Sequence, residues 1–170
     1  ATRIILWAHN YHIMTQRLAS ARSMGTYLRS LYGHRYYALG LTFESGQHQA
    51  WSTHVDTSGK FLLKSFVAGN APEESAEWYL DKAGLDPFLI DFRSTSKTEL
   101  VSAWLAAPRR VRSHGAQLSD TDTGFADGAY SLGEALDGVL FVKTSTRARP
   151  TVRMRDRFSA GTDSDKASGR

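Results

Sequence analysis

Two histidines, an asparagine and a tyrosine stand together near the start of the chain, in the stretch Leu-Trp-Ala-His-Asn-Tyr-His of residues 6–12. Histidine titrates near neutral pH, so His9 and His12 can take a proton from water and return it to a leaving group. The amide of Asn10 and the phenol of Tyr11 can hydrogen-bond to a substrate or orient a ring. The stretch therefore offers two catalytic candidates, His9 and His12, and two substrate-binding candidates, Asn10 and Tyr11.

Two other roles stay open for the same residues. In the first, a histidine and an asparagine tie down a turn through backbone hydrogen bonds and do no chemistry. In the second, His9 and His12 share a metal ion. The chain has no cysteine and no second closely spaced His/Asp cluster, whereas zinc generally takes three or four ligands from the protein. We therefore predict no metal at this place and no cofactor.

The element that leads into these residues is the apolar run Arg-Ile-Ile-Leu-Trp of residues 3–7. A short run of this kind, rich in β-branched residues, is typical of a strand covered on both faces. Ligands of open α/β sheets bind beyond the carboxyl ends of the strands. We therefore predict a central strand over residues 3–7, with His9 at the rim of a cleft.

Strands and helices are predicted to alternate along the rest of the chain. Met24, Tyr27, Leu28 and Leu31 lie at i, i+3, i+4 and i+7, which indicates one face of a helix between an N-cap at Ser23 and a stop at Gly33. Two more helices are expected, one capped by Asn70 and ended by Gly84, the other running from a Ser96–Glu99 capping box to Trp104. The further predicted strands are residues 35–43, 87–92, 109–116 and 138–144, and residues 44–70 are expected to form a loop or a hairpin.

This alternation predicts an α/β fold with a largely parallel or mixed sheet and helices packed on both faces. We assign residues 1–150 to this domain, and we expect it to be part of the domain of a longer protein, because the chain enters a strand within three residues. Residues 151–170 are expected to be a basic, disordered tail, since they are rich in Ser, Gly, Asp and Lys.

The charge distribution argues against a nucleic-acid partner. The net charge is +4, and the segment from Arg147 to the end holds seven basic and three acidic residues, so the body before it is balanced. No apolar run approaches the roughly 20 residues of a membrane helix, and the start lacks the pattern of a signal peptide. We expect a cytoplasmic protein whose partner is a small molecule and not a membrane; no pattern points to an oligomeric state.

Five ordered motifs resemble the erythromycin esterase family. They are WAHNYH (7–12), SMGTYLRSLYGHRYYALGLTFESG (23–46), LIDFR (89–93), VRSHGA (111–116) and ALDGVLFVKTST (135–146). Members of that family look like metal-independent hydrolases, some of which open macrolide lactones and confer antibiotic resistance, while others were named succinoglycan biosynthesis proteins. The resemblance implies that a histidine–glutamate cluster activates water for attack on the ester carbonyl.

The resemblance places His9 and His12 on the two histidines of the family's His-Asn-x-His motif, with Asn10 between them. The family also carries a Gly-Glu-x-x-His segment with a catalytic glutamate and the histidine taken as general base, and this chain has no such segment. The resemblance thus covers only the C-terminal half of the family domain, and we expect the chain alone to be inactive. Two other readings stay open, a non-catalytic small-molecule-binding domain and a protein of exopolysaccharide (succinoglycan) biosynthesis.

Overall fold

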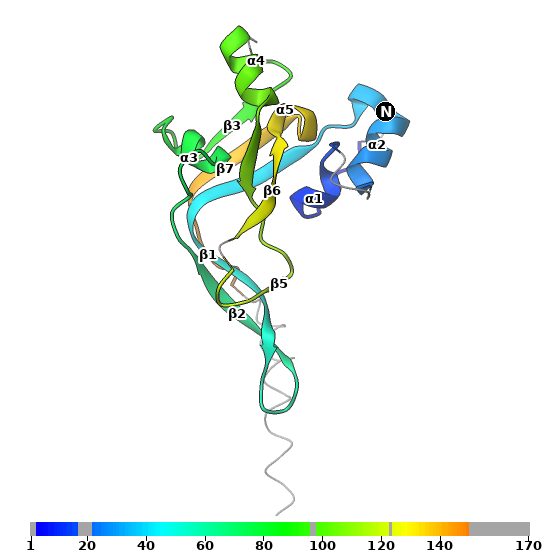
Figure 1. The fold of residues 1–170 in the computed structure, drawn as a ribbon. Helices are drawn as coiled ribbons and strands as arrows, with labels where there is room; N and C mark the ends of the chain where they lie inside the picture. The colour runs from blue at the N-terminus through cyan, green and yellow to red at the C-terminus, as the bar shows by residue number, and fades with distance from the viewer. Residues whose placement is uncertain (1–2, 17–21, 96–97, 123, 150–170) are drawn as a thin grey trace, which may run out of the picture.

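A computed structural model describes residues 3–16, 22–95, 98–122 and 124–149, and a long curved strand, β1 (Leu39–Val55), runs through it (Figure 1). The main sheet has the order β2 (Phe61–Ala68), β1, β7 (Gly138–Ser145) and β3 (Phe88–Asp91), and the short β5 (Gln117–Leu118) also pairs with β1. Strands β7 and β5 are parallel to β1, whereas β2 is antiparallel to β1 and β3 is antiparallel to β7. The prediction of an α/β fold with a mixed sheet is therefore confirmed.

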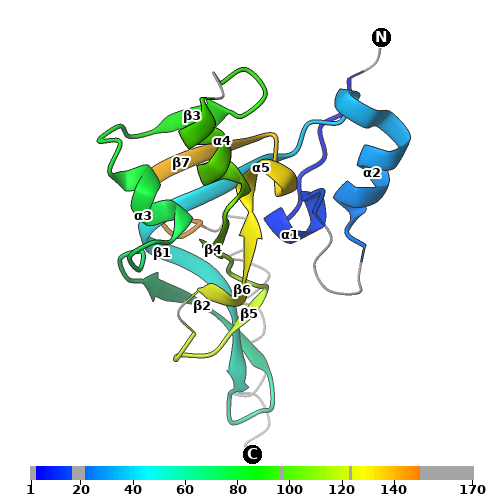
Figure 2. The same ribbon diagram turned by 45° about the horizontal axis from the view of Figure 1, so that its top comes forward.

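A second, two-stranded sheet of β4 (Pro108–Arg112) and β6 (Phe125–Ser131) lies in front of the main sheet in Figures 1 and 2. Three of the helices are α3 (Ala76–Asp81), α4 (Glu99–Ala106) and α5 (Leu132–Ala135), the last of which joins β6 to β7. The hydrophobic core draws on all of these elements. Its members include Leu80, Leu105, Val111, Tyr130 and the fully buried Phe141. Burial of side chains such as Phe141 contributes most of the stability of such a layered domain.

A glycine allows β1 to change partners halfway along its length. Gly46 is opposite Ser145 at the end of β7 and opposite Ala68 at the end of β2. Its φ is +126°, and a Cβ there would lie 2.2 Å from the carbonyl oxygen of Ser145, so no other residue fits. Beyond this point β1 pairs with β2 and, at Trp51 and Ser52, also with β5, and the far end of the β1–β2 hairpin is an arm that projects from the body (Figure 1).

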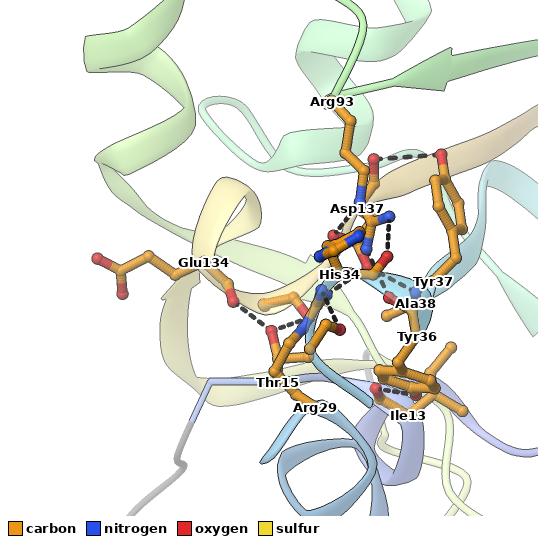
Figure 3. A network of polar contacts seen from close by, with 12 residues as sticks. Ile13, Thr15, Arg29, His34, Tyr36, Tyr37, Ala38, Arg93, Glu134 and Asp137 are labelled. Carbon is orange, nitrogen blue, oxygen red and sulfur yellow. Dashed lines mark hydrogen bonds and ion pairs between the residues drawn. The ribbon is translucent and has the colours of Figure 1, made fainter. Parts of the chain in front are cut away.

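A network of ion pairs ties the first residues of β1 and β7 to two flanking segments (Figure 3). The carboxylate of Asp137 accepts hydrogen bonds from the backbone N–H of Ala38 (2.7 Å), from Nη2 of Arg29 (2.5 Å) and from Nε of Arg93 (2.8 Å). Arg29 lies on α2 (Met24–Tyr32) and Arg93 just after β3. The almost buried carboxylate therefore fixes a helix and two strands at one point, which charge-assisted bonds do well.

The predicted strand over residues 3–7 is wrong, because residues 3–9 form neither helix nor strand. Ile5 is 92% exposed and Trp7 is 85% exposed. A strand needs a neighbour for its backbone N–H and C=O groups, and no strand pairs with this segment in the described part of the chain. The segment leads into a single helical turn, α1 (Asn10–Ile13), which lies beside α2 (Figure 2).

Three other predicted features need correction, although the elements themselves are present. Helix α2 has its caps at Ser23 and Gly33 as expected, but it packs through Gly25 onto the backbone of α1 and exposes Tyr27 and Leu31. Helix α3 begins after Ser75 and not after Asn70, since the Ser75 hydroxyl accepts from the N–H of Trp78. In the predicted strand 35–43 the even-numbered positions are the buried ones.

The strands expected at residues 87–92 and 138–144 are present as β3 and β7, and the hairpin expected within residues 44–70 is formed by the second half of β1 with β2. The strand expected at 109–116 is present as the shorter β4. Helix α4 is capped by Thr98, while Ser96 and the proposed tail at residues 151–170 lie outside the described residues. No helix of the described residues has the length and apolar character needed to cross a membrane.

Candidate functional site

His9 is the N-cap of α1, where its side chain takes the place of the usual serine or aspartate. Its Nδ1 accepts a hydrogen bond from the backbone N–H of Tyr11 at 3.2 Å. Because Nδ1 accepts, the neutral ring carries its proton on Nε2. Burial lowers the pKa of His9 below its ordinary 6.5, while a hydrogen bond with the backbone of His114 acts against this shift. His9 is therefore a neutral hydrogen-bond donor near pH 7.

Helix α1 has only four residues, so contacts outside the helix must hold it in place. The amide of Asn10 donates to the carbonyl of Leu41 (2.8 Å) and accepts from the N–H of Leu41 (3.1 Å), as a neighbouring strand would. The hydroxyl of Tyr36 donates to the carbonyl of Ile13 at 2.6 Å, and the hydroxyl of Thr15 donates to the carbonyl of Glu134 at 2.6 Å (Figure 3). These bonds fix His9 relative to β1 and α5.

Two further residues of the motif, Tyr11 and His12, have their rings next to that of His9. Tyr11 stacks on His9, with 5.6 Å between centroids and 18° between planes, and also approaches Tyr130. His12 is exposed and meets the His9 ring edge-on at 6.2 Å. The structure thus brings His9, Tyr11 and His12 together, whereas it uses both polar atoms of Asn10 to bind β1.

A second pair of histidines, His48 and His114, lies next to this motif and was not selected from the sequence. Their rings stack with 3.8 Å between centroids, and the stack continues to Phe43 on one side and to Phe66 on the other. All four ring nitrogens are buried without a hydrogen-bond partner among the described residues. Burial, the neighbouring His48 and Arg112 lower the pKa of His114 to about 4, and burial also lowers the pKa of His48.

A fully buried carboxyl group, Glu77 of α3, is bound to Arg112, two residues before His114. Its Oε1 accepts from the hydroxyl of Thr42 at 2.6 Å and from the backbone N–H of Arg112 at 2.9 Å, while Oε2 has no partner among the described residues. Burial raises the pKa of Glu77 above its ordinary value. A second buried glutamate, Glu44 on β1, accepts a hydrogen bond from the N–H of Ala71. Acidic residues therefore belong to this region although the sequence pattern did not point to them.

The arrangement can donate hydrogen bonds and exchange protons through imidazoles held neutral by burial. Among the described residues, no three His, Cys, Asp or Glu side chains are grouped as metal ligands. A cavity of about 410 Å³ lies elsewhere, between α4, α5 and the end of β3, and no histidine lines it. Of its three charged residues, Arg93 and Asp137 are paired with each other, and the third is Glu134 of α5.

One sequence signal could have linked His114 to Arg112, although none links it to His48. Arg112 and His114 stand two residues apart on an extended segment, so their side chains point to the same face. By contrast, His54 lies exposed on the arm and His34 lies exposed after α2.

The comparisons with known proteins agree with this architecture. The sequence profile of the erythromycin esterase family matches residues 1–145. A Bacillus subtilis (strain 168) protein named "Putative hydrolase YbfO" is 26% identical over 152 residues, which are 85% of this chain and 30% of that protein.

Three solved structures share the fold at lower identity. A Bacillus cereus protein gives a TM-score of 0.67 at 20% identity, covering 82% of this chain and 33% of that one. A succinoglycan biosynthesis protein gives 0.64 at 22% identity, with 82% and 32% covered. A variant of erythromycin esterase EreC in its open conformation gives 0.52 at 18% identity, with 80% and 30% covered. The chain spans about a third of the length of these relatives, and it belongs to the erythromycin esterase family.

Proposed function

We propose that this chain supplies the His9-bearing part of the active site of an ester hydrolase that opens macrolide lactones by attack of water. Membership of the erythromycin esterase family and the similarity to a hydrolase support hydrolytic chemistry. The observation that carries the proposal is the state of His9, a neutral imidazole fixed through Nδ1 by the N–H of Tyr11.

The role of His9 follows from which of its nitrogens carries the proton. Nδ1 is engaged as an acceptor, so Nε2–H is the reactive side of the ring. When water attacks an ester carbonyl, its oxygen bonds to the carbonyl carbon and the carbonyl oxygen becomes an oxyanion. A substrate oxygen that displaces the backbone of His114 from this N–H would gain a hydrogen bond that strengthens as the charge develops. Collapse of the intermediate breaks the C–O bond, and the leaving alkoxide takes up the proton that the general base removed from the water.

Under this proposal His9 is not the base that removes the proton from water. The family's Gly-Glu-x-x-His segment, which the resemblance makes the source of that base, does not occur in the 170 residues. Loss of a general base typically costs about two to four orders of magnitude in rate. We therefore expect the chain alone to be inactive and to act as part of the full-length protein. His12, edge-on to His9, has a supporting role, and Tyr11 lines the substrate side.

The experiment is to measure erythromycin ring opening by liquid chromatography and mass spectrometry with the full-length protein, comparing wild type, His9→Ala, His9→Gln and His54→Ala. We expect His9→Ala to lose roughly a hundredfold in kcat/KM, as for loss of an oxyanion donor or acid. His9→Gln should retain part of the activity, because its amide can still donate a hydrogen bond. His54→Ala, the exposed control, should match wild type. Full activity of a folded His9→Ala variant would refute this role.

A second candidate function has one specific observation in its favour. The structural similarity to the succinoglycan biosynthesis protein, with a TM-score of 0.64, exceeds that to EreC, with 0.52. The corresponding proposal is a role in exopolysaccharide synthesis, or binding of a small molecule without turnover. A full-length protein that binds erythromycin in calorimetry without opening it would support binding alone. Loss of polysaccharide on gene deletion, without a change in macrolide susceptibility, would support the polysaccharide role.

A further inference from the structure

Arg112, at the end of β4, makes more contacts with the backbone of other elements than any group in the histidine motif. Its Nε donates to the carbonyl of Phe43 at 3.0 Å, and its Nη2 donates to the carbonyls of Glu44 (2.5 Å) and Gly69 (2.8 Å). Its own backbone N–H donates to Glu77. The residue is 4% exposed. One guanidinium therefore joins two neighbouring residues of β1 and the residue after β2 to the end of β4.

The same guanidinium continues the aromatic stack that contains the two histidines. It lies 5.0 Å from the centroid of the Phe43 ring and 4.6 Å from that of Phe125. Phe43 in turn stacks on His114 at 5.5 Å, and His114 stacks on His48. Planar guanidinium groups suit such stacking, and lysine does not reproduce it. The place of His114 thus depends on a ring that Arg112 holds from the other side.

We propose that Arg112 is a positioning residue of this site: its guanidinium fixes the backbone of β1 at Phe43 and Glu44 to the end of β4 and so holds the ring of His114 against His48 and beside His9. The catalytic consequence of this proposal rests on the proposed function, whereas the structural consequence does not. Arg112 acts through the histidines and does not itself touch the substrate.

The charges around the histidine pair give the proposal a measurable signature. The groups that act on His114 are His48 on β1, Arg112 on β4, Asp122 after β5 and His9 at the start of α1. Only Asp122 favours the protonated ring. Arg112 lowers the pKa of both His48 and His114, in addition to the effect of burial. Loss of the guanidinium must therefore change both the packing of the rings and their titration.

The test is nuclear magnetic resonance of the isotopically labelled 170-residue chain, following the histidine ring signals as the pH is lowered from 8. In wild type we expect contacts between the ring protons of His48 and His114, and slow solvent exchange of the Nε–H of Arg112. Arg112→Lys keeps the charge but loses the multiple bonds, so the ring contacts should weaken. Arg112→Met also removes the charge, and the pKa of His114 should rise by about one unit. Arg110→Met is the matched control, since Arg110 is exposed on the same strand.

The proposal is overturned if the wild-type rings show no mutual contact or if the Nε–H of Arg112 exchanges as fast as that of Arg110. These wild-type measurements decide the matter even where Arg112→Met does not fold. Unchanged ring contacts and pKa in a folded Arg112→Lys or Arg112→Met variant overturn it equally. In the full-length protein, Arg112→Lys should move the acid limb of the pH profile of kcat/KM. If no macrolide is hydrolysed by wild type, the proposed function fails while the resonance test still stands.

Discussion

The imidazole rings of His48 and His114 stack face to face, with 3.8 Å between their centroids and 29° between their planes. The two residues lie 66 positions apart in the chain, on β1 and after β4. Neither ring has a hydrogen-bond partner among the described residues, and unpaired buried polar groups are costly unless they have a role. This pair lies next to His9, and the structure reveals it although neither residue was selected from the sequence.

The histidine pair predicts that the chain loses stability as the pH falls below neutrality. The pKa of His114 is about 4 in the folded chain and 6.5 in the unfolded chain, and that of His48 is also lowered. Below pH 6.5 the unfolded chain takes up protons that the folded chain does not, so folding weakens until about pH 4. The melting temperature should therefore be steady from pH 8 to 7 and fall from pH 6.5 to 4.5.

Two variants test this prediction, one of a buried histidine and one of an exposed histidine. His114→Asn should flatten the fall in melting temperature, because one titrating group with a lowered pKa is removed. His54→Asn should leave it unchanged, since His54 is exposed on the arm. Equal slopes for wild type and His114→Asn would show that another group sets the acid limit.

Much of the fold could be predicted because local signals fix several elements. Ser23 and Gly33 bound α2 through a cap and a stop, and the apolar run at residues 138–144 became the central strand β7. Position within the fold was harder to predict. The apolar segment at residues 3–7 has the composition of a strand, yet a strand exists only with a neighbour, and the chain spans about a third of its relatives' length.

The site was predicted only in its local part, for a physical reason. His9, Tyr11 and His12 are adjacent in sequence, so one turn of helix brings their rings together. His48 and His114 meet only because the fold brings the end of β4 next to β1, where Arg112 binds the backbone of Phe43 and Glu44, and the spacing of the two histidines in the sequence does not predict this contact. Asn10 was predicted to bind substrate from its residue type, but both polar atoms of its amide are hydrogen-bonded to the backbone of Leu41.

Replacement of Gly46 should show that its close approach to β7, and not only its backbone conformation, is required. Gly46→Ala places a Cβ 2.2 Å from the carbonyl oxygen of Ser145 at a φ of +126°. Gly59→Ala, in the turn of the arm, meets a φ of +78° but open space. The control should lose about 1 kcal/mol of unfolding free energy, and Gly46→Ala clearly more, by urea denaturation. Equal losses of unfolding free energy in the two variants would show that the close contact between Gly46 and Ser145 does not affect stability.

Replacement of Asp137 should be far more damaging than replacement of an exposed acidic residue. Asp137→Asn removes the charge of a nearly buried carboxylate that binds Arg29 and Arg93, and the weaker hydrogen bonds that remain should cost about 2 kcal/mol. Asp120 pairs with Lys64 at the surface, so Asp120→Asn is the matched control and should change little. Urea denaturation of both variants measures the difference. A similar effect of the two substitutions would mean that the Asp137 network in Figure 3 is not a stabilising centre.

Replacement of Asn10 should release α1 and, with it, His9. Asn10→Asp keeps an acceptor for the N–H of Leu41 but sets a carboxylate oxygen against the carbonyl of Leu41, which the native amide donates to. A four-residue helix has little stability of its own, so its amides should exchange faster in hydrogen–deuterium exchange. The pKa of His9 should also return toward 6.5 as its burial is lost. Asn70→Asp, at an exposed position, is the control. If both variants kept the wild-type exchange and titration of this region, the contact between Asn10 and Leu41 would not be what positions His9.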